Sequence, residues 1–279
     1  MVLLSLLEIL ALATATLLAC GKYGTRNMAP LAALPLAATL LGIIDFEAAL
    51  PIAMAPPVGL IAAMQLERGR AYGELIAAAS IPGLVLGLFM LANIDDWVES
   101  PEQLTLAMSQ LEEAGTPEEI AAIQILWSTM VRLLPGFTFV SVLLMAVLSY
   151  GAGHFFSGRV AMFAAMPPPP LVRTWRLWDP LIWVLIGGTC LWFLGTGMLE
   201  DLGLNAVTVM LVLYAAQGFS VARYMVWRLG ITSFLELLFY GALLFSGLAL
   251  PLLAGVGLMD TWFDWRRLAH RAEPGGDSK

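Results

Sequence analysis

Three polar side chains inside apolar stretches of this sequence could contact a bound molecule. Gln217 interrupts the run LVLYAAQGFSVARY, which begins at Leu211, and Asn205 and Tyr214 precede it. Lipid supplies no hydrogen-bond partner, so the Gln217 amide needs partners on other helices or on a ligand. Two interpretations stay open: an interhelical hydrogen bond, or a polar ligand contacted by Gln217, Asn205 and Tyr214 in a cavity. Asn205 could alternatively cap its helix.

Two carboxylates lie inside apolar runs, Glu8 near the start of the chain and Glu236 in the last run. An ionised carboxylate at membrane depth is costly and marks a functional site by default. Glu8 follows the chain start by only about two helical turns, so it could instead reach the membrane interface. The functional interpretation and the interfacial one stay open.

Asp260 and Asp264 are four residues apart on one face of an expected helix. They could hold a metal ion as a pair, but Arg267 and Arg271 follow on the same side, which favours local ion pairing. The sequence contains no HExxH, GxSxG or P-loop motif and no Cys/His cluster. We therefore expect no catalytic residue, no metal site and no cofactor.

Ala11, Ala15 and Ala19 recur at every fourth position of the first apolar run. Small side chains at this spacing form a flat stripe that lets a second helix approach closely. The stripe predicts a helix interface, either within the protein or with a partner subunit. No Lys or Arg precedes the run, so we interpret residues 2–20 as a retained span and not as a cleaved signal peptide.

The composition places these residues in a membrane protein. Of the 279 residues, 59% are hydrophobic and 13% are charged, whereas soluble domains carry about 25% charged residues. Several runs approach the roughly 20 apolar residues that cross a bilayer as a helix. We expect one all-α, polytopic transmembrane bundle over residues 1–279, with about eight spans. The expected spans are 2–20, 29–44, 48–66, 75–92, 133–153, 180–199, 204–222 and 232–258.

Prolines predict irregularities in two of these regions. The third run, 48–66, contains three prolines and is expected to be kinked or broken. A helix that starts at Pro117 can run to Leu134, and Pro135 should kink it before the next span.

Residues 93–119 are expected to form a small acidic helical cap outside the membrane. The segment holds eight acidic residues, among them Glu112 and Glu113, and no Lys or Arg. Its motifs SPEQ and TPEE each place a hydroxyl residue at a helix N-cap, proline next, and Gln or Glu at the third helical position, which is the pattern of a capping box. The cap is either a solvated loop or a docking surface.

A linker rich in proline and tryptophan, 166–180, reads MPPPPLVRTWRLWDP. Four consecutive prolines favour an extended polyproline II conformation. Trp175 and Trp178 follow, and tryptophans at such positions anchor a span at the membrane interface. They could also form a docking surface. The tail, 266–279, is basic and then glycine-rich, and we expect it to be flexible.

Positive and negative charges alternate between successive connections. The basic connections carry Lys22, Arg26, Arg68, Arg70, Arg159, Arg173, Arg176, Arg223 and Arg228. The acidic connections carry Asp45, Glu47, the acidic cap, Glu200 and Asp201. The positive-inside rule places the basic set in the cytoplasm and the acidic set outside. With a net charge of −7 and no basic domain, the chain offers no surface for nucleic acid.

One feature conflicts with this alternation. An eighth simple crossing would put Arg266, Arg267 and Arg271 outside the membrane, against the positive-inside rule. Either the run 232–258 does not cross once, or the count of spans near residues 29–66 is wrong.

The stretches RLWDPLIWVLI, NAVTVMLVLYAAQGFSVARY and GLMDTWFDWRRL, and more loosely ERGRAYGELI, carry a family resemblance. They resemble the YybS-like family of predicted bacterial membrane proteins, which has no assigned activity. Members of that family are considered similar to the substrate-binding S components of energy-coupling-factor transporters. The resemblance implies a ligand and a transmembrane coupling subunit that would meet the alanine stripe. The acidic cap and the extra spans depart from an S component.

These features predict a non-enzymatic, multi-pass subunit of the bacterial inner membrane. It would be S-component-like and would bind a small-molecule or lipid ligand or couple to another membrane protein subunit. The alternative is a structural subunit of a larger inner-membrane complex. In that case the docking surface would be formed by Glu112, Glu113, Trp175 and Trp178.

Overall fold

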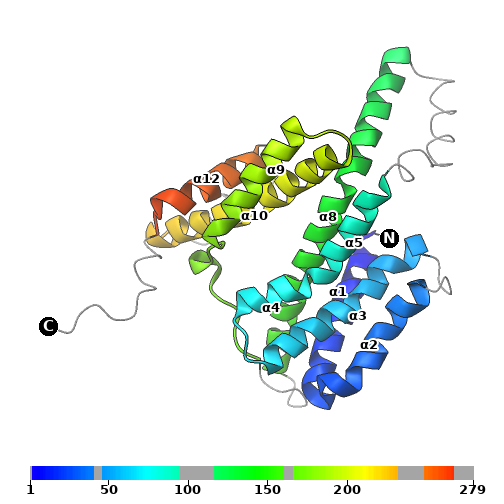
Figure 1. Cartoon of the computed structure of the whole chain (residues 1–279). Coiled ribbons are helices and arrows are strands. Elements are labelled where there is room, and N and C mark those ends of the chain that lie inside the picture. The colour runs from blue at the N-terminus through cyan, green and yellow to red at the C-terminus, as the bar shows by residue number, and fades with distance from the viewer. Residues whose placement is uncertain (1, 41–45, 95–115, 160–165, 232–247, 267–279) are drawn as a thin grey trace. The chain divides into compact units, whose positions relative to one another are not determined.

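The computed structural model describes residues 2–40, 46–94, 116–159, 166–231 and 248–266. All regular secondary structure within these ranges is helical (Figure 1). The chain divides into two compact units, Met1–Pro169 and Pro170–Lys279, and the boundary falls in the run of four prolines. We describe the units separately. A single domain over residues 1–279 remains a prediction.

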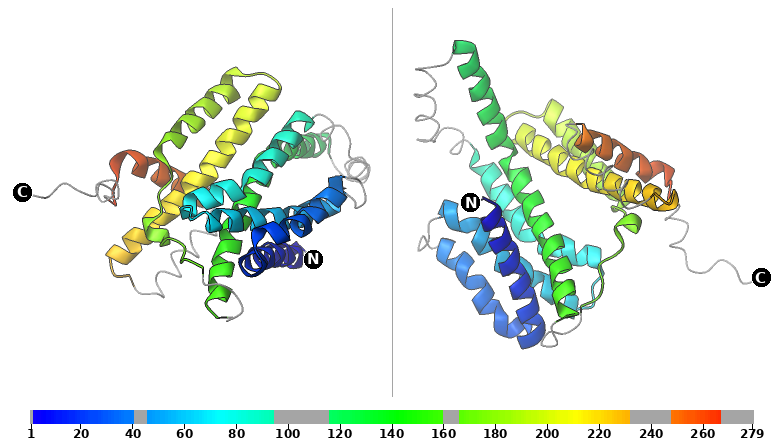
Figure 2. Two further views of the ribbon diagram at one scale, coloured as in Figure 1. Left: turned by 60° about the horizontal axis from the view of Figure 1, so that its bottom comes forward. Right: turned by 180° about the vertical axis from the view of Figure 1, so that it is seen from behind.

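Unit 1 contains six helices in its described residues. They are α1 (Val2–Tyr23), α2 (Thr25–Leu40), α3 (Phe46–Glu67), α4 (Tyr72–Ala79), α5 (Ile81–Ala92) and α8 (Pro117–Ser157). Helix α1 packs against α2, α3 and α8, and α5 packs along α8 (Figure 2). Apolar side chains that recur on one face of each helix are thereby removed from solvent or lipid.

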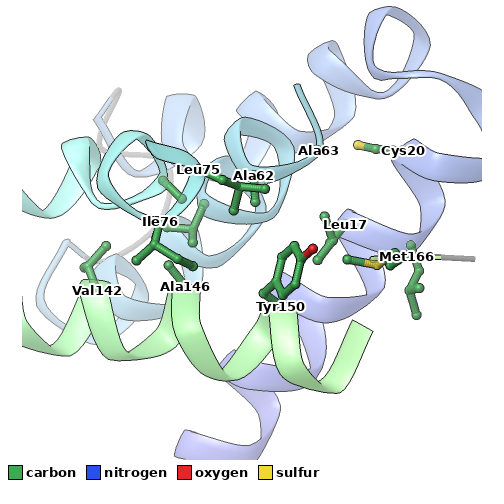
Figure 3. Close-up of a cluster of buried hydrophobic side chains, with 13 residues drawn as sticks. Leu17, Cys20, Ala62, Ala63, Leu75, Ile76, Val142, Ala146, Tyr150 and Met166 are labelled. Atoms are coloured by element: carbon green, nitrogen blue, oxygen red, sulfur yellow. The ribbon is translucent and has the colours of Figure 1, made fainter. Parts of the chain in front are cut away.

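The core of unit 1 lies where α1, α3, α4 and α8 meet (Figure 3). Leu17, Leu75 and Tyr150 are buried there among small residues such as Ala62 and Ala146. Small residues at the contacts let the helix backbones approach closely, as in other membrane-helix bundles. The large side chains then fill the remaining space.

Prolines lie inside three continuous helices of unit 1, α2, α3 and α8, and another proline follows the point where the run 75–92 divides. Helix α3 is unbroken from Phe46 to Glu67, so of the two forms expected for the run 48–66, kinked or broken, the broken one is wrong. Helix α8 likewise continues through Pro135 as one element of 41 residues. Prolines are tolerated inside membrane helices because neighbouring helices and side chains can satisfy the freed backbone groups. The run 75–92 instead divides at Ser80, with proline in the first turn of α5.

The start of α8 is one of the two predicted capping boxes. The Glu119 N–H donates to the Thr116 hydroxyl at 3.4 Å, and the Thr116 N–H donates to the Glu119 carboxylate at 2.8 Å. The SPEQ motif and most of the acidic cap, residues 95–115, lie outside the described residues. The cap therefore remains a prediction.

The basic connections of unit 1 gather at one end. Thr25, at the start of α2, donates its N–H and its hydroxyl to the Glu67 carboxylate at the end of α3, at 3.2 and 2.7 Å. The ring of Tyr72, at the start of α4, meets the ring of Tyr150, near the end of α8, edge to face. These connections carry Lys22, Arg26, Arg68, Arg70 and Arg159. Their gathering at one end is what the positive-inside rule requires.

Unit 2 contains two short 3₁₀ turns and three helices in its described residues. They are η1 (Val172–Thr174), η2 (Asp179–Leu181), α9 (Ile182–Leu194), α10 (Met198–Arg228) and α12 (Ala249–Phe263). Helix α10 packs against both α9 and α12 (Figures 1 and 2). Helix α10 is longer than the expected span 204–222 because the chain turns earlier, at Gly195–Gly197. Glu200 and Asp201 therefore lie in its first turn, where carboxylates interact favourably with the helix dipole.

Helices α10 and α12 cross with their backbones in contact. A Cβ atom on Gly257 would overlap the Tyr214 carbonyl oxygen and lie 2.7 Å from the Gly218 nitrogen. A Cβ atom on Gly218 would overlap the Leu253 carbonyl oxygen. Only glycine fits at both positions. The crossing brings the polar residues that flank it on the two helices close together.

Within the described residues, three helices are long and apolar enough to cross a membrane by length and composition. They are Tyr72–Ala92, which combines α4 and α5, Ala121–Ser157 within α8, and Met198–Arg228. Shorter apolar helices lie at Ile52–Glu67, Asp179–Leu194 and Ala249–Phe263. The expected count of about eight spans stays a prediction.

Candidate functional site

Gln217 lies at the centre of a buried polar cluster in unit 2, which we define as Gln217, Ser220, Asp260, Thr261 and Arg266. Its side-chain nitrogen donates to the Gly257 carbonyl at 3.0 Å and lies 3.3 Å from the Asp260 carboxylate and 3.4 Å from the Thr261 hydroxyl. Its side-chain oxygen accepts from the Leu177 N–H at 3.1 Å. The amide thus joins α10 to α12 and to the linker.

Asp260 and Arg266 form an ion pair whose side chains are both fully buried. The Arg266 Nη2 lies 2.7 Å from the Asp260 Oδ2. Removing two charges from water is expensive, and attraction in a low dielectric repays the cost only with further hydrogen bonds. Arg266 makes those bonds with its second terminal nitrogen. Nη1 donates to the Arg173 carbonyl at 3.2 Å, the Trp175 carbonyl at 2.8 Å and the Ser220 hydroxyl at 2.6 Å.

Ser220 holds the linker to α10. Its hydroxyl lies within hydrogen-bonding distance of the carbonyls of Val172 and Trp175. The Leu177 N–H also donates to Gln217, so residues 172–177 are held along α10 by two residues of that helix, Gln217 and Ser220. The linker is therefore a structural part of unit 2 and not a free tether.

Arg176 contacts the cluster at Thr261 and forms ion pairs with two aspartates. It donates to the Asp179 carboxylate at 3.0 and 3.2 Å and to the Thr261 carbonyl at 3.3 Å. It also lies 3.3 Å from the Asp264 carboxylate. Because Asp264 is largely buried while Asp179 is more exposed, the Arg176–Asp264 contact is the less screened of the two ion pairs.

The chain reaches this arrangement because α12 ends at Asp264. That residue has left-handed backbone angles, φ 40° and ψ 52°, which aspartate tolerates better than most residues. The turn directs Arg266 back toward Asp260, six positions earlier. An ordinary helix would place these two positions on different faces.

The cluster satisfies most of its own polar groups. Among its buried atoms in the described chain, only Asp260 Oδ1 and Arg266 Nε lack a hydrogen-bond partner. The Gln217 amide is fully buried, and its N–H groups are directed at protein acceptors. These contacts support the interhelical interpretation of Gln217. A ligand contact by Gln217 stays a prediction, and the contacts do not support it.

Asn205 and Tyr214 are also enclosed by protein. Asn205 lies inside α10 and donates to the Asp201 carbonyl at 2.8 Å, so it is not a helix cap. Tyr214 is buried in the apolar core of unit 2 with Met210, Ala215 and Ala254. The structure places both on the same helix as Gln217. Neither Asn205 nor Tyr214 is among the hydrogen-bond partners of the Gln217 amide in the described residues.

The aspartates of α12 form ion pairs, as the sequence favoured, but with other partners. Asp260 pairs with Arg266 and Asp264 with Arg176. The expected partners Arg267 and Arg271 lie outside the described residues. No group of three or more metal-ligating side chains occurs in the part of the chain that the structure describes.

The alanine stripe of α1 lies on its outer side. Ala11 and Ala15 are exposed and Ala19 is half-buried. Glu8 is exposed as well, whereas Ala13 and Leu17 are buried in unit 1. The buried face meets α3 closely, since a Cβ on Gly59 would overlap the Ala13 carbonyl oxygen. The stripe is therefore not the surface that α1 uses within unit 1.

The expected docking residues are only partly described. Trp178 is 70% exposed and Trp175 is half-buried beside Ser220. Glu112, Glu113 and Glu236 lie outside the described residues.

Ser220, Thr261 and Arg266 are the members of the cluster that reasoning from the sequence does not find. Arg266 belongs to the expected basic tail, and Ser220 and Thr261 carry no charge or motif. Their spacing along the chain gives no signal, because the contact arises from the turn at Asp264 and from the linker. The one usable sign was an arginine placed just after an apolar helix that ends in two aspartates.

The cluster also indicates at which end of unit 2 the C-terminal segment lies. Arg266 contacts the backbone of Arg173 and Trp175, so it lies at the same end of unit 2 as the basic linker. Helix α12 has 15 residues, which at 1.5 Å per residue is about 22 Å, less than the roughly 30 Å of a bilayer core. Both explanations for the conflicting arginines stay predictions, because residues 232–247 lie outside the described residues.

Comparisons with known proteins give one match. No curated protein and no solved structure matches the chain. A family model described as "Predicted membrane protein (DUF2232)" matches residues 1–261. The match covers all of unit 1 and most of unit 2, and it ends within α12. The chain therefore belongs to the predicted membrane protein family DUF2232.

Proposed function

We propose that this protein is a non-enzymatic, multi-pass subunit of the bacterial inner membrane that couples to a partner membrane protein through the outer face of α1. The observation that carries the proposal is the exposure of Ala11 and Ala15 while the opposite face of the same helix is buried. A helix face of small residues allows a second helix to approach closely.

The internal packing of the protein supports this use of small residues. Helices α1 and α3 meet where Gly59 contacts the Ala13 backbone, and α10 and α12 meet at Gly218 and Gly257. Helix association in lipid depends on such close packing, because the apolar lipid chains offer no hydrophobic gain. The Ala11–Ala15 face provides a similar surface for a helix outside unit 1.

The S-component-like role follows from the YybS-like resemblance and includes a small-molecule or lipid ligand. Of its two parts, coupling to a partner subunit is better supported than binding of a ligand. The ligand residues suggested by the sequence, Gln217, Asn205 and Tyr214, are buried and packed within unit 2. The coupling proposal does not depend on a ligand.

A scaffold role in a larger complex is the second candidate. The exposed indole of Trp178, beside a linker that is fixed along α10, supports it. A rigid aromatic side chain on a fixed backbone loses little conformational entropy on docking. The two roles differ in the partner. A transport role requires an ATPase together with its coupling subunit, and a scaffold role requires a stoichiometric assembly without one.

The test is purification of the full chain in mild detergent, with mass spectrometry of the proteins that remain bound. We expect Ala15→Leu to reduce the amount of bound partner several-fold because the larger side chain separates the two helices. Ala77→Leu on α4 is the matched control, since Ala77 is also exposed but lies outside the stripe. Equal partner recovery by both variants and the wild type would contradict the proposal.

A further inference from the structure

Two arginines near the end of α10 have no carboxylate partner within the described residues. Arg173 lies in the linker and Arg228 in the last turn of α10, and neither forms an ion pair there. Arg176 and Arg266, by contrast, are both paired with aspartates. Within the described part of the chain no carboxylate neutralises Arg173 or Arg228, so both can attract an anion.

Trp227 fixes the position of the Arg173 guanidinium. The Arg173 Cζ lies 4.3 Å from the centroid of the Trp227 ring, and the Tyr224 ring lies 5.9 Å from that of Trp227. Stacking on an indole occupies one face of the guanidinium and leaves the N–H groups at its edge free to donate. Trp227 is 56% exposed, so the stacked pair lies at the surface of unit 2.

The polar cluster holds the backbone of Arg173 in place. Buried Arg266 donates to the Arg173 carbonyl, and Ser220 binds the carbonyls on either side, those of Val172 and Trp175. A side chain that extends from a fixed backbone loses less entropy when it binds. The cluster therefore prepares Arg173 to bind an anion.

The surroundings of Arg173 fit the phosphate of a lipid headgroup. The guanidinium N–H groups match phosphate oxygens in pairs. Tryptophan is enriched at the headgroup level, and basic residues at the cytoplasmic face are attracted to anionic lipids. We propose that Arg173, stacked on Trp227, binds the phosphate of an anionic phospholipid in the leaflet at this end of α10, and that Arg228 in the same last turn adds positive charge to the surface. This lipid site is separate from the partner interface proposed on α1.

The test is lipid binding to the full-length protein in detergent, measured by native mass spectrometry with phosphatidylglycerol and phosphatidylcholine. We expect phosphatidylglycerol to bind more tightly, and Arg173→Gln to weaken it roughly fivefold, the attraction of about one basic side chain to an anionic leaflet. Arg173→Lys keeps the charge without the paired N–H groups and should lie between. Trp227→Leu should weaken binding because it removes the stacking surface.

Arg26→Gln is the matched control. Arg26 is exposed in the first turn of α2, on the side predicted to be cytoplasmic, and no described aromatic ring stacks on it. The proposal is overturned if Arg26→Gln weakens phosphatidylglycerol binding as much as Arg173→Gln, or if Arg173→Gln binds like the wild type. Displacement of the lipid by millimolar inorganic phosphate would assign the site to free phosphate and would contradict the proposed lipid ligand. Thermal unfolding of each variant checks that it is folded. The lipid-binding results do not depend on whether a partner protein binds α1, so this test and the test of the proposed function can fail separately.

Discussion

At the scale of single residues, the Arg266 side chain joins the linker, α10 and Asp260 of α12 through four hydrogen bonds. One guanidinium binds the Asp260 carboxylate, the Ser220 hydroxyl and two linker carbonyls. The pair alone would gain little, because desolvation of two buried ions offsets their attraction. Its contribution to stability therefore depends on the whole cluster, and each member is needed to keep the others satisfied.

The first prediction concerns the two charges of this pair. Arg266→Met should lower the free energy of unfolding by about 3–5 kcal/mol, because it leaves Asp260 as an uncompensated buried charge. Adding Asp260→Leu removes that charge and should restore part of the loss. Denaturant titration in detergent measures both variants. A double variant no more stable than Arg266→Met would show that the two side chains do not form an energetically coupled pair.

The second prediction concerns pH and the first turn of α8. The hydrogen bonds of the capping box with Thr116 lower the pKa of Glu119 below its ordinary value of 4.5. A carboxyl group whose pKa is lower in the folded state stabilises the fold above its unfolded-state pKa, and this contribution is lost as pH falls through the folded-state pKa. We expect hydrogen exchange at the start of α8 to accelerate as pH falls below about 4.5, relative to the intrinsic rate.

Glu119→Gln is the control for this effect. Glutamine can form the same capping box without titrating. The variant should therefore lose the acceleration at low pH and keep the protection at neutral pH. An unchanged pH dependence would assign the effect to other carboxylates.

At the scale of helices, glycine decides how α10 and α12 meet. The backbone atoms of Tyr214 and Gly218 occupy the space where a Gly257 Cβ would lie, and backbone cannot move aside as a flexible side chain can. The same closeness brings Gln217 within reach of the Gly257 carbonyl. Loss of the crossing should therefore also disrupt the polar cluster.

The third prediction compares two glycines of α12. Gly257→Ala should destabilise unit 2 by at least about 1–3 kcal/mol, the usual cost of overpacking. Gly255 has no atom within 4 Å of an added Cβ, so Gly255→Ala should be neutral or slightly stabilising. Thermal unfolding of the two variants side by side measures the difference. Equal unfolding temperatures would contradict the close crossing.

Helix content was predictable from the sequence, and helix boundaries less so. Apolar runs located all the described helices, because bilayer-length apolar segments have few alternatives to helix. The start of α10 was missed because Glu200 and Asp201 looked like a connection, whereas Gly195 and Gly197 make the turn. The break at Ser80 does not stand out in the sequence, because Pro82 is a single proline in an otherwise uninterrupted apolar run.

At the scale of the whole molecule, the gathering of the basic connections of unit 1 at one end was predictable, and the polar cluster was not. The capping box at Thr116 and the polar role of Gln217 follow from local rules. The partners of Gln217 come from the linker and from α12, about 40 residues away on either side. Such contacts depend on the tertiary arrangement, which no spacing in the sequence encodes.

The central claim is that the polar cluster holds the linker and the C-terminal end of α12 at one end of unit 2, opposite the turn between α9 and α10. The most direct test is cysteine labelling with a membrane-impermeant reagent on intact cells and on inverted vesicles. Single cysteines would be placed at Thr174, Trp265 and Thr196, all exposed, in a background without Cys20 and Cys190. We predict that positions 174 and 265 are labelled only in inverted vesicles and position 196 only in intact cells. Labelling of 174 and 265 from opposite sides, or of 196 from the same side as 174, would contradict the claim.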